Sequence, residues 1–166
     1  CEFLAAVFTI ATLYALWFFR NLERIPDERD RLVFIAPIDG EIASIESAGE
    51  GARITIKTGF FDARLIRSPV QSVAVFSSVS HGIEGAEGYL KHRESLILGE
   101  KVSLTLFPNC KSSRFYNFKN GSYLGERLGF FYGGEVALAL PKESEIKVAV
   151  GAKVKAGETA LGFARS

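Results

Sequence analysis

The sequence pattern is clearest in the stretch LVFIAPIDGEIASI, which covers residues 32–45. Its two ends, Leu32–Ile35 and Glu41–Ile45, are short runs that contain several β-branched or aromatic residues. Between them the dipeptide Asp39-Gly40 is a strong turn signal, because both residue types favour tight turns. Short apolar runs separated by turn residues indicate β-structure, so we expect a strand, a turn and a second strand here.

The same alternation continues along the rest of the chain. Further strands are predicted at Arg53–Lys57, Val70–Phe76, Leu96–Leu98, Val102–Phe107, Arg114–Phe118, Val136–Leu140 and Ile146–Val150. Asn120-Gly121 and Gly133-Gly134 are the other strong turn signals. After Arg20 no stretch keeps a helical period over about a dozen residues. Residues 32–166 have the length of one domain, and we expect a mainly β domain, either a barrel or a sandwich.

A different composition precedes this domain. From Phe3 to Phe19 the chain is apolar except for Thr9, Thr12 and the hydroxyl of Tyr14. As a helix this run is about 25 Å long, just short of the roughly 30 Å core of a bilayer. Aromatic residues gather at its end, and such residues favour the interface between membrane and water. We therefore expect residues 1–20 to form a transmembrane helix that is truncated at its N-terminus.

Positive charge follows this apolar run closely. The arginines are Arg20, Arg24, Arg29 and Arg31, and residues 21–31 are predicted to form a charged juxtamembrane linker. Such charge marks the cytoplasmic side, so the β domain is expected at the inner (cytoplasmic) membrane, facing the cytoplasm. A buried core helix would carry a polar stripe, and a signal peptide would begin with basic residues and end in small ones. A lipid-modified Cys1 is a further alternative.

Composition excludes several classes of function. The net charge is +1, which gives no reason to expect a nucleic-acid partner. The two cysteines, Cys1 and Cys110, are too few for a disulfide framework or a cysteine-rich metal site. The two histidines, His81 and His92, lie in polar contexts and are expected at the surface, so no metal site is predicted.

One short motif occurs twice in the second half of the chain. GERLGF at residues 125–130 returns as GETALGF at residues 157–163. The second copy follows residues 150–156, a pattern typical of a tight turn between two strands. The repeat predicts a degree of internal pseudo-symmetry in the β domain.

Several blocks resemble one known family in order and spacing. FFRNLERIP at residues 18–26 and APIDG at residues 36–40 are similar to F-F-R-D-P-x-R…P and S-P-A-D-G of the phosphatidylserine decarboxylases. FDARLIRSPV at residues 61–70 is similar to D-V-H-V-N-R-x-P-V of that family, and the likeness continues through residues 125–130 and 148–161. The resemblance is to the short, membrane-anchored bacterial and archaeal type, and it covers about residues 18–164.

The resemblance has a chemical implication at one turn. Family members cut their own chain at a Gly-Ser bond, and the serine becomes a pyruvoyl group that serves as the electron sink for decarboxylation. The family serine lies in F-G-S-R-V, and the matching residues here are Tyr132-Gly133-Gly134-Glu135-Val136. Glycine has neither a nucleophilic hydroxyl nor a β-carbon, so no pyruvoyl group is expected at Gly134. No cofactor is therefore expected.

A second family position has also changed. The family histidine in D-x-H, which takes part in proton transfer, corresponds to Arg64, and arginine stays protonated near neutral pH. Asp39 is retained, and Arg67 matches the family arginine before the proline. The resemblance thus implies an abandoned active site at Asp39, Arg64, Gly133 and Gly134. Arg64 and Arg67 are candidates for binding the phosphate or carboxylate of a substrate-like head group, with plain surface charge as the alternative.

We therefore expect a degenerate, catalytically inactive relative of the phosphatidylserine decarboxylases. Its expected partners are a membrane phospholipid, with phosphatidylserine as the first candidate, and other subunits of a homo- or hetero-oligomer in a scaffold role. One alternative is an active decarboxylase that makes phosphatidylethanolamine through Ser122, although the Asn120-Gly121 pair before it favours an exposed serine in a hairpin turn. Another alternative is a tethered β domain without a lipid role.

Overall fold

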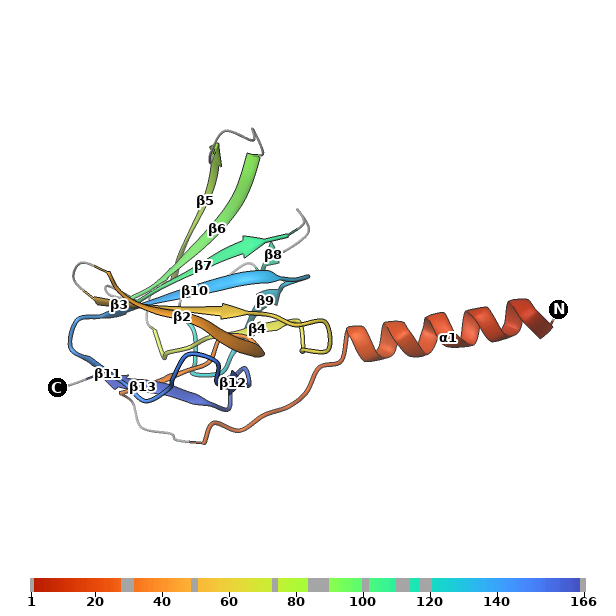
Figure 1. Ribbon diagram of the computed structural model, residues 1–166, viewed down its shortest axis with the longest axis horizontal. Coiled ribbons are helices and arrows are strands. Elements are labelled where there is room, and N and C mark those ends of the chain that lie inside the picture. The colour runs from red at the N-terminus through yellow and green to blue at the C-terminus, as the bar shows by residue number, and fades with distance from the viewer. Residues whose placement is uncertain are drawn as a thin grey trace.

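The computed structural model describes residues 2–27, 32–48, 51–72, 75–83, 90–99, 102–109, 114–116 and 121–164. Helix α1 (Glu2–Phe18) extends away from a domain that is built of strands (Figure 1). The predicted mainly β class, preceded by an N-terminal helix, is confirmed.

Helix α1 is exposed along residues 2–16, and only its last two residues, Trp17 and Phe18, are partly buried. None of its 17 residues is buried, and the hydroxyls of Thr9 and Thr12 donate to the carbonyls of Ala5 and Phe8 at 2.8 Å. Within the described residues, no helix is long and apolar enough to cross a membrane. The transmembrane helix expected at residues 1–20 is therefore not confirmed, because α1 measures about 25 Å against a bilayer core of about 30 Å.

The segment after α1 is bonded to the β domain. We call residues 19–27 the strap; it runs along one side of the strands to its last described residue (Figure 1). The amide of Asp27 donates to the carbonyl of Glu158 at 3.0 Å, and the carbonyl of Leu22 accepts a bond from Arg67. The strap thus covers part of the region predicted to be a charged juxtamembrane linker, and its contacts fix it to the domain.

The strands form three antiparallel sheets. The large sheet has the order β12 (Lys153–Val154), β2 (Gly40–Ala48), β3 (Gly51–Lys57), β10 (Gly134–Pro141), β7 (Val102–Pro108), β6 (Leu90–Leu98) and β5 (Val75–Ile83). The first small sheet has the order β1 (Val33–Ile35), β13 (Ala160–Ala164) and β11 (Ser144–Ile146). The second has the order β4 (Leu65–Arg67), β9 (Arg127–Phe130) and β8 (Arg114–Phe115). The described strands do not close into a barrel.

The core follows from the period of two in the central strands. Leu138 on β10 pairs with Leu104 on β7 and with Ile54 on β3, and all three side chains are fully buried. Successive side chains of a strand point to opposite faces, so the alternating apolar residues of these strands meet on one side of the sheet. In the same sheet, the end of β3 lies beside the start of β10, where the Thr58 amide donates to the carbonyl of Gly134 at 3.1 Å.

Several predicted strands differ from the observed ones. The strand predicted at Val70–Phe76 overlaps β5 only at Val75 and Phe76; residues 70–72 lie outside any strand and follow Ser68-Pro69, where proline lacks the N–H that a ladder needs. The strand predicted at Leu96–Leu98 is the last part of the longer β6. The strand predicted at Ile146–Val150 ends at Ile146 instead. The strand predicted at Arg114–Phe118 is observed as Arg114–Phe115, and residues 117–118 lie outside the described residues.

The repeated sequence motif marks the same local structure twice. Gly125 and Gly157 have φ angles of +75° and +74°, a region that favours glycine. Each glycine opens the turn before a strand, β9 and β13 respectively. The Gly125 amide donates to the carbonyl of Ser68 at 3.0 Å, and the Gly157 amide donates to that of Ala36 at 2.9 Å. Ser68 and Ala36 each precede a proline just after the partner strand, so the two units are locally alike.

Candidate functional site

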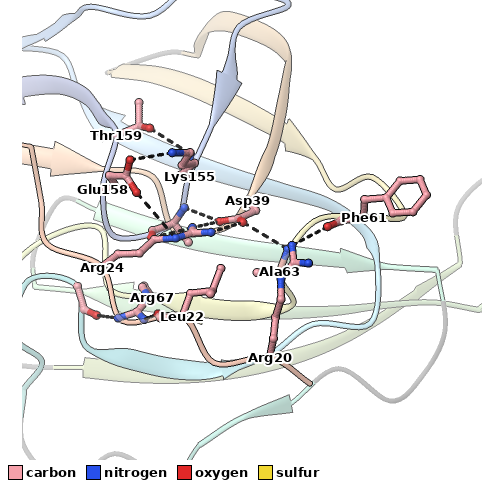
Figure 2. Close-up of polar contacts among 12 residues, drawn as sticks. Arg20, Leu22, Arg24, Asp39, Phe61, Ala63, Arg67, Lys155, Glu158 and Thr159 are labelled. Carbon is pink, nitrogen blue, oxygen red and sulfur yellow. Dashed lines mark hydrogen bonds and ion pairs between the residues drawn. The ribbon is translucent and has the colours of Figure 1, made fainter. Parts of the chain in front are cut away.

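Asp39 lies in the bend after β1 and is only 6% exposed. Its Oδ1 accepts hydrogen bonds from Nη1 of Arg24 and from the amide of Ala156, the latter at 2.7 Å (Figure 2). Its Oδ2 accepts from Nη2 of Arg24 at 2.7 Å and from the amide of Ala63 at 3.3 Å. A carboxylate that accepts four hydrogen bonds from fixed donors organises the surrounding structure.

Arg24 is the partner that Asp39 binds through both oxygens. Its Nη1 also donates to the carbonyl of Ala156 at 3.3 Å, and its Nε lies 3.9 Å from a carboxylate oxygen of Glu158 (Figure 2). The hydrogen bonds to Asp39 raise the pKa of Arg24 above its ordinary value, while burial acts in the opposite direction. Arg24 therefore attaches the strap to the domain through the retained family aspartate.

Arg64 is buried beside the predicted cleavage position. It is 5% exposed, its Nη2 donates to the carbonyl of Phe60 at 3.1 Å, and its guanidinium lies 5.5 Å from the ring centre of Phe18. Its Nε is buried without a hydrogen-bond partner, and the group forms no ion pair with any described carboxylate. Among the described residues, a backbone carbonyl and the face of an aromatic ring are the groups that face this charge.

Gly134 begins β10 in a backbone conformation that excludes other residues. Its φ angle is +130°, and a β-carbon added there would lie 2.3 Å from the carbonyl oxygen of Phe107. Gly133 before it has a φ angle of +144°, and a β-carbon there would lie 3.1 Å from Nη1 of Arg64. A serine at position 134 therefore requires the backbone to move.

The structure brings the predicted family positions together. Asp39 bonds the amide of Ala63, the next residue is Arg64, and the Arg64 guanidinium adjoins Gly133. What occupies the space beside the Gly133-Gly134 turn is the arginine side chain. The sequence identified these four positions, but it treated Arg24 as a juxtamembrane charge and did not pair it with Asp39. The sequence feature that could have indicated the pairing of Arg24 with Asp39 is the family block at residues 18–26, which contains Arg24 as its second arginine.

Ser122 lies in a different environment from the one predicted. It is 4% exposed, so the expectation of an exposed serine in a hairpin turn is wrong. Its backbone forms an antiparallel bridge with Ser72, with both bonds at 2.8 Å, and its hydroxyl lies 2.9 Å from that of Ser68. This pairing buries the hydroxyl, and no described contact joins Ser122 to Asp39, Arg64 or Gly134.

Arg67 connects the strap to the two repeated turns. Its guanidinium donates to the carbonyls of Leu22 and Gly125, the latter at 2.9 Å, and a β-carbon at Gly157 would lie 2.5 Å from its Cδ. Burial lowers the pKa of Arg67 from its ordinary value, and the charges of Arg127 and Arg24 act in the same direction. These three arginines line an open hollow of about 490 Å³, together with Glu23, Gly125 and Glu126.

Comparison with known proteins places the chain in a family. It is 30% identical to the phosphatidylserine decarboxylase proenzyme of Desulfotalea psychrophila, over 98% of this chain and 85% of that protein. The proenzyme of the same name from Syntrophus aciditrophicus is 27% identical, over 92% of this chain and 80% of that protein. The proenzyme of that name from Geotalea uraniireducens is 29% identical, over 96% of this chain and 84% of that protein. No protein-family model and no solved structure matches the chain. The chain belongs to the phosphatidylserine decarboxylase family.

Proposed function

We propose that this chain is a catalytically inactive, membrane-attached member of the family that recognises an anionic phospholipid. The observation that carries the proposal is Gly134. The residue lacks the hydroxyl that self-cleavage needs, and a β-carbon added to it would lie only 2.3 Å from the Phe107 carbonyl oxygen. Pyruvoyl formation at this turn would need both a different residue and a different backbone.

The neighbouring groups support the loss of chemistry. Arg64 stands at the family histidine position, and an arginine side chain is not suited to general acid–base catalysis near neutral pH. The Asp39 carboxylate is engaged by Arg24 and by two backbone amides. These contacts give Asp39 a structural role that does not depend on catalysis.

Recognition of an anionic head group is supported by the Arg64 guanidinium. A buried charge without a counter-ion is unfavourable, and a phosphate or carboxylate oxygen would supply the missing partner. Phosphatidylserine carries both groups and is our first candidate. Arg67 is a weaker candidate, because its donors already bond the carbonyls of Leu22 and Gly125.

Attachment to the inner (cytoplasmic) membrane is supported by the surface of α1. The helix is apolar and exposed along residues 2–16, and an aromatic cluster of Tyr14, Trp17 and Phe18 lies at its end. We propose that α1 enters the apolar region of the bilayer and that the β domain faces the cytoplasm. We further propose that this chain acts as a scaffold that binds another subunit at the membrane.

The alternative is an active decarboxylase that makes phosphatidylethanolamine by processing at Ser122. The Gly121-Ser122 pair favours it, since it supplies the required bond between these two residue types. The experiment is conversion of phosphatidylserine to phosphatidylethanolamine in mixed micelles by the full chain and by Ser122→Ala. We expect no turnover from either protein. Turnover by the unmodified chain would overturn the proposal, and its loss in Ser122→Ala would identify the serine.

A further inference from the structure

The loop between β3 and β4, residues 58–64, exposes two adjacent aromatic rings. Phe60 is 60% exposed and Phe61 is 73% exposed. Figure 2 shows the Phe61 ring turned away from the polar contacts around Asp39. A pair of large apolar side chains at a loop tip is unfavourable in water and commonly marks a contact surface.

This loop has a fixed shape. The Gly59 amide donates to Oδ2 of Asp62 at 2.6 Å, which closes the turn around the two phenylalanines. The Arg64 side chain donates to the Phe60 carbonyl from inside the domain. The rings are therefore held outward by the polar contacts beneath them.

The loop is also attached to the end of α1. The Trp17 ring lies 6.0 Å from Phe60 and 5.6 Å from Phe61, measured between ring centres. Arg20 donates to the Phe61 carbonyl at 2.7 Å and stacks over Trp17 at 5.2 Å. Figure 1 shows the segment after β3 reaching the C-terminal end of the helix. The exposed aromatic surface of the loop is thus continuous with that of α1.

Charged side chains of both signs lie around the loop. A cleft of about 500 Å³ behind it is lined by two basic side chains, Lys57 and Lys153, and by two acidic ones, Glu41 and Asp62. Two further basic side chains bond the loop itself: Arg20 donates to the Phe61 carbonyl, and the buried Arg64 donates to the Phe60 carbonyl. Aromatic rings beside lysine and arginine suit the interface of a bilayer that contains anionic lipids.

We propose that the Phe60–Phe61 loop is a second membrane contact, by which the β domain itself enters the interfacial zone of an anionic bilayer beside α1. This inference rests on the proposed membrane attachment of α1. Two attachment points would fix the orientation of the domain. They would also hold Arg64, which bonds the Phe60 carbonyl, at the depth of the lipid head groups.

The test uses the fact that Trp17 is the single tryptophan of the chain. Trp17→Phe combined with Phe61→Trp moves the only tryptophan to the loop and keeps an aromatic ring at position 17. Trp17→Phe combined with Tyr123→Trp is the control, because Tyr123 is equally exposed at 74% but lies before β9. Each full-length protein is bound to vesicles of phosphatidylcholine and phosphatidylglycerol whose acyl chains are brominated near the carbonyl.

We expect a shift to shorter emission wavelength and loss of fluorescence from the tryptophan at position 61, but neither effect at position 123. Quenching of Trp17 in the unmodified chain without quenching at position 61 would overturn the second contact and leave attachment by α1 intact. No quenching at either position 17 or position 61 would overturn both. Equal quenching at positions 61 and 123, or shielding of position 61 without vesicles, would also contradict the loop contact.

Discussion

At the scale of single residues, Gly134 is the main difference from the family pattern, because it stands where that pattern has a serine. Glycine lacks the hydroxyl of serine. Gly134, at the start of β10, has a φ angle of +130°, and a β-carbon added to it would lie 2.3 Å from the carbonyl oxygen of Phe107. Restoring the serine alone should therefore fail to restore processing. The backbone would first have to withdraw from the Phe107 carbonyl oxygen and the Asn109 amide nitrogen, which would lie 2.3 Å and 3.0 Å from the new β-carbon.

We predict that Gly134→Ser lowers the free energy of unfolding by about 3 kcal/mol and yields no cleaved chain. Gly151→Ser is the matched control, because Gly151 has a φ angle of +85° but no atom within 4 Å of a β-carbon. That variant should lose only about 1 kcal/mol, from backbone strain alone. Urea denaturation and gel electrophoresis measure both effects. Equal stabilities, or two fragments from Gly134→Ser, would contradict the steric argument.

We expect Arg64 to bind the ligand and to lower the stability of the fold when the ligand is absent. Arg64→Met removes a buried charge that has no described carboxylate partner, so stability without lipid should stay equal or rise. A soluble short-chain phosphatidylserine should raise the Tm of the unmodified protein but not that of Arg64→Met. Arg53→Met, at an exposed position on β3, is the control for loss of one charge. The same shift of Tm in all three proteins would exclude a role for Arg64.

At the scale of elements, the strap is the part whose role was hardest to foresee. The Asp39–Arg24 pair, with side chains 8% and 11% exposed, holds it against the domain. We predict that Arg24→Ala lowers the free energy of unfolding by about 3 kcal/mol, because it leaves the Asp39 carboxylate buried and partly unpaired. Arg127→Ala breaks the exposed pair with Glu23, at 3.1 Å, and should lose less than about 1 kcal/mol. A loss of less than about 1 kcal/mol from Arg24→Ala, measured by urea denaturation, would show that the strap is not held by Asp39.

The sequence predicted the elements whose pattern is local. Strands β3 and β7 alternate apolar and polar residues over several positions, and β10 alternates large apolar residues with alanine, so their periods of two are visible without knowledge of partners. Strands β4, β9, β12 and β13 are short, and their stability comes from partners distant in the chain, so propensity alone did not indicate them.

The candidate site was predictable in its positions and less so in its contacts. Family spacing identified Asp39, Arg64 and Gly134, but the Arg24 partner lies 15 residues before Asp39 and no local rule pairs them. The burial of Ser122 depends on its contacts with Ser68 and Ser72, which lie far from it in the sequence. Contacts of this kind are set by the tertiary fold and not by the local sequence.

At the scale of the whole molecule, α1, the strap and the β domain form one connected arrangement. The helix ends against the Phe60–Phe61 loop, and the strap then carries the chain past Asp39 and Arg67 (Figures 1 and 2). In an active family member the chain must be in two pieces. Under the proposed function this chain stays uncut, and Asp39 serves to hold the strap against the β domain.

The intact mass of the purified full chain tests the central claim most directly. We predict a single species near 18.2 kDa, which means no self-cleavage and no pyruvoyl group. Two fragments, the C-terminal one lacking a free amino group, would contradict the account. Their masses would distinguish a cut before Ser122 from one at the family position.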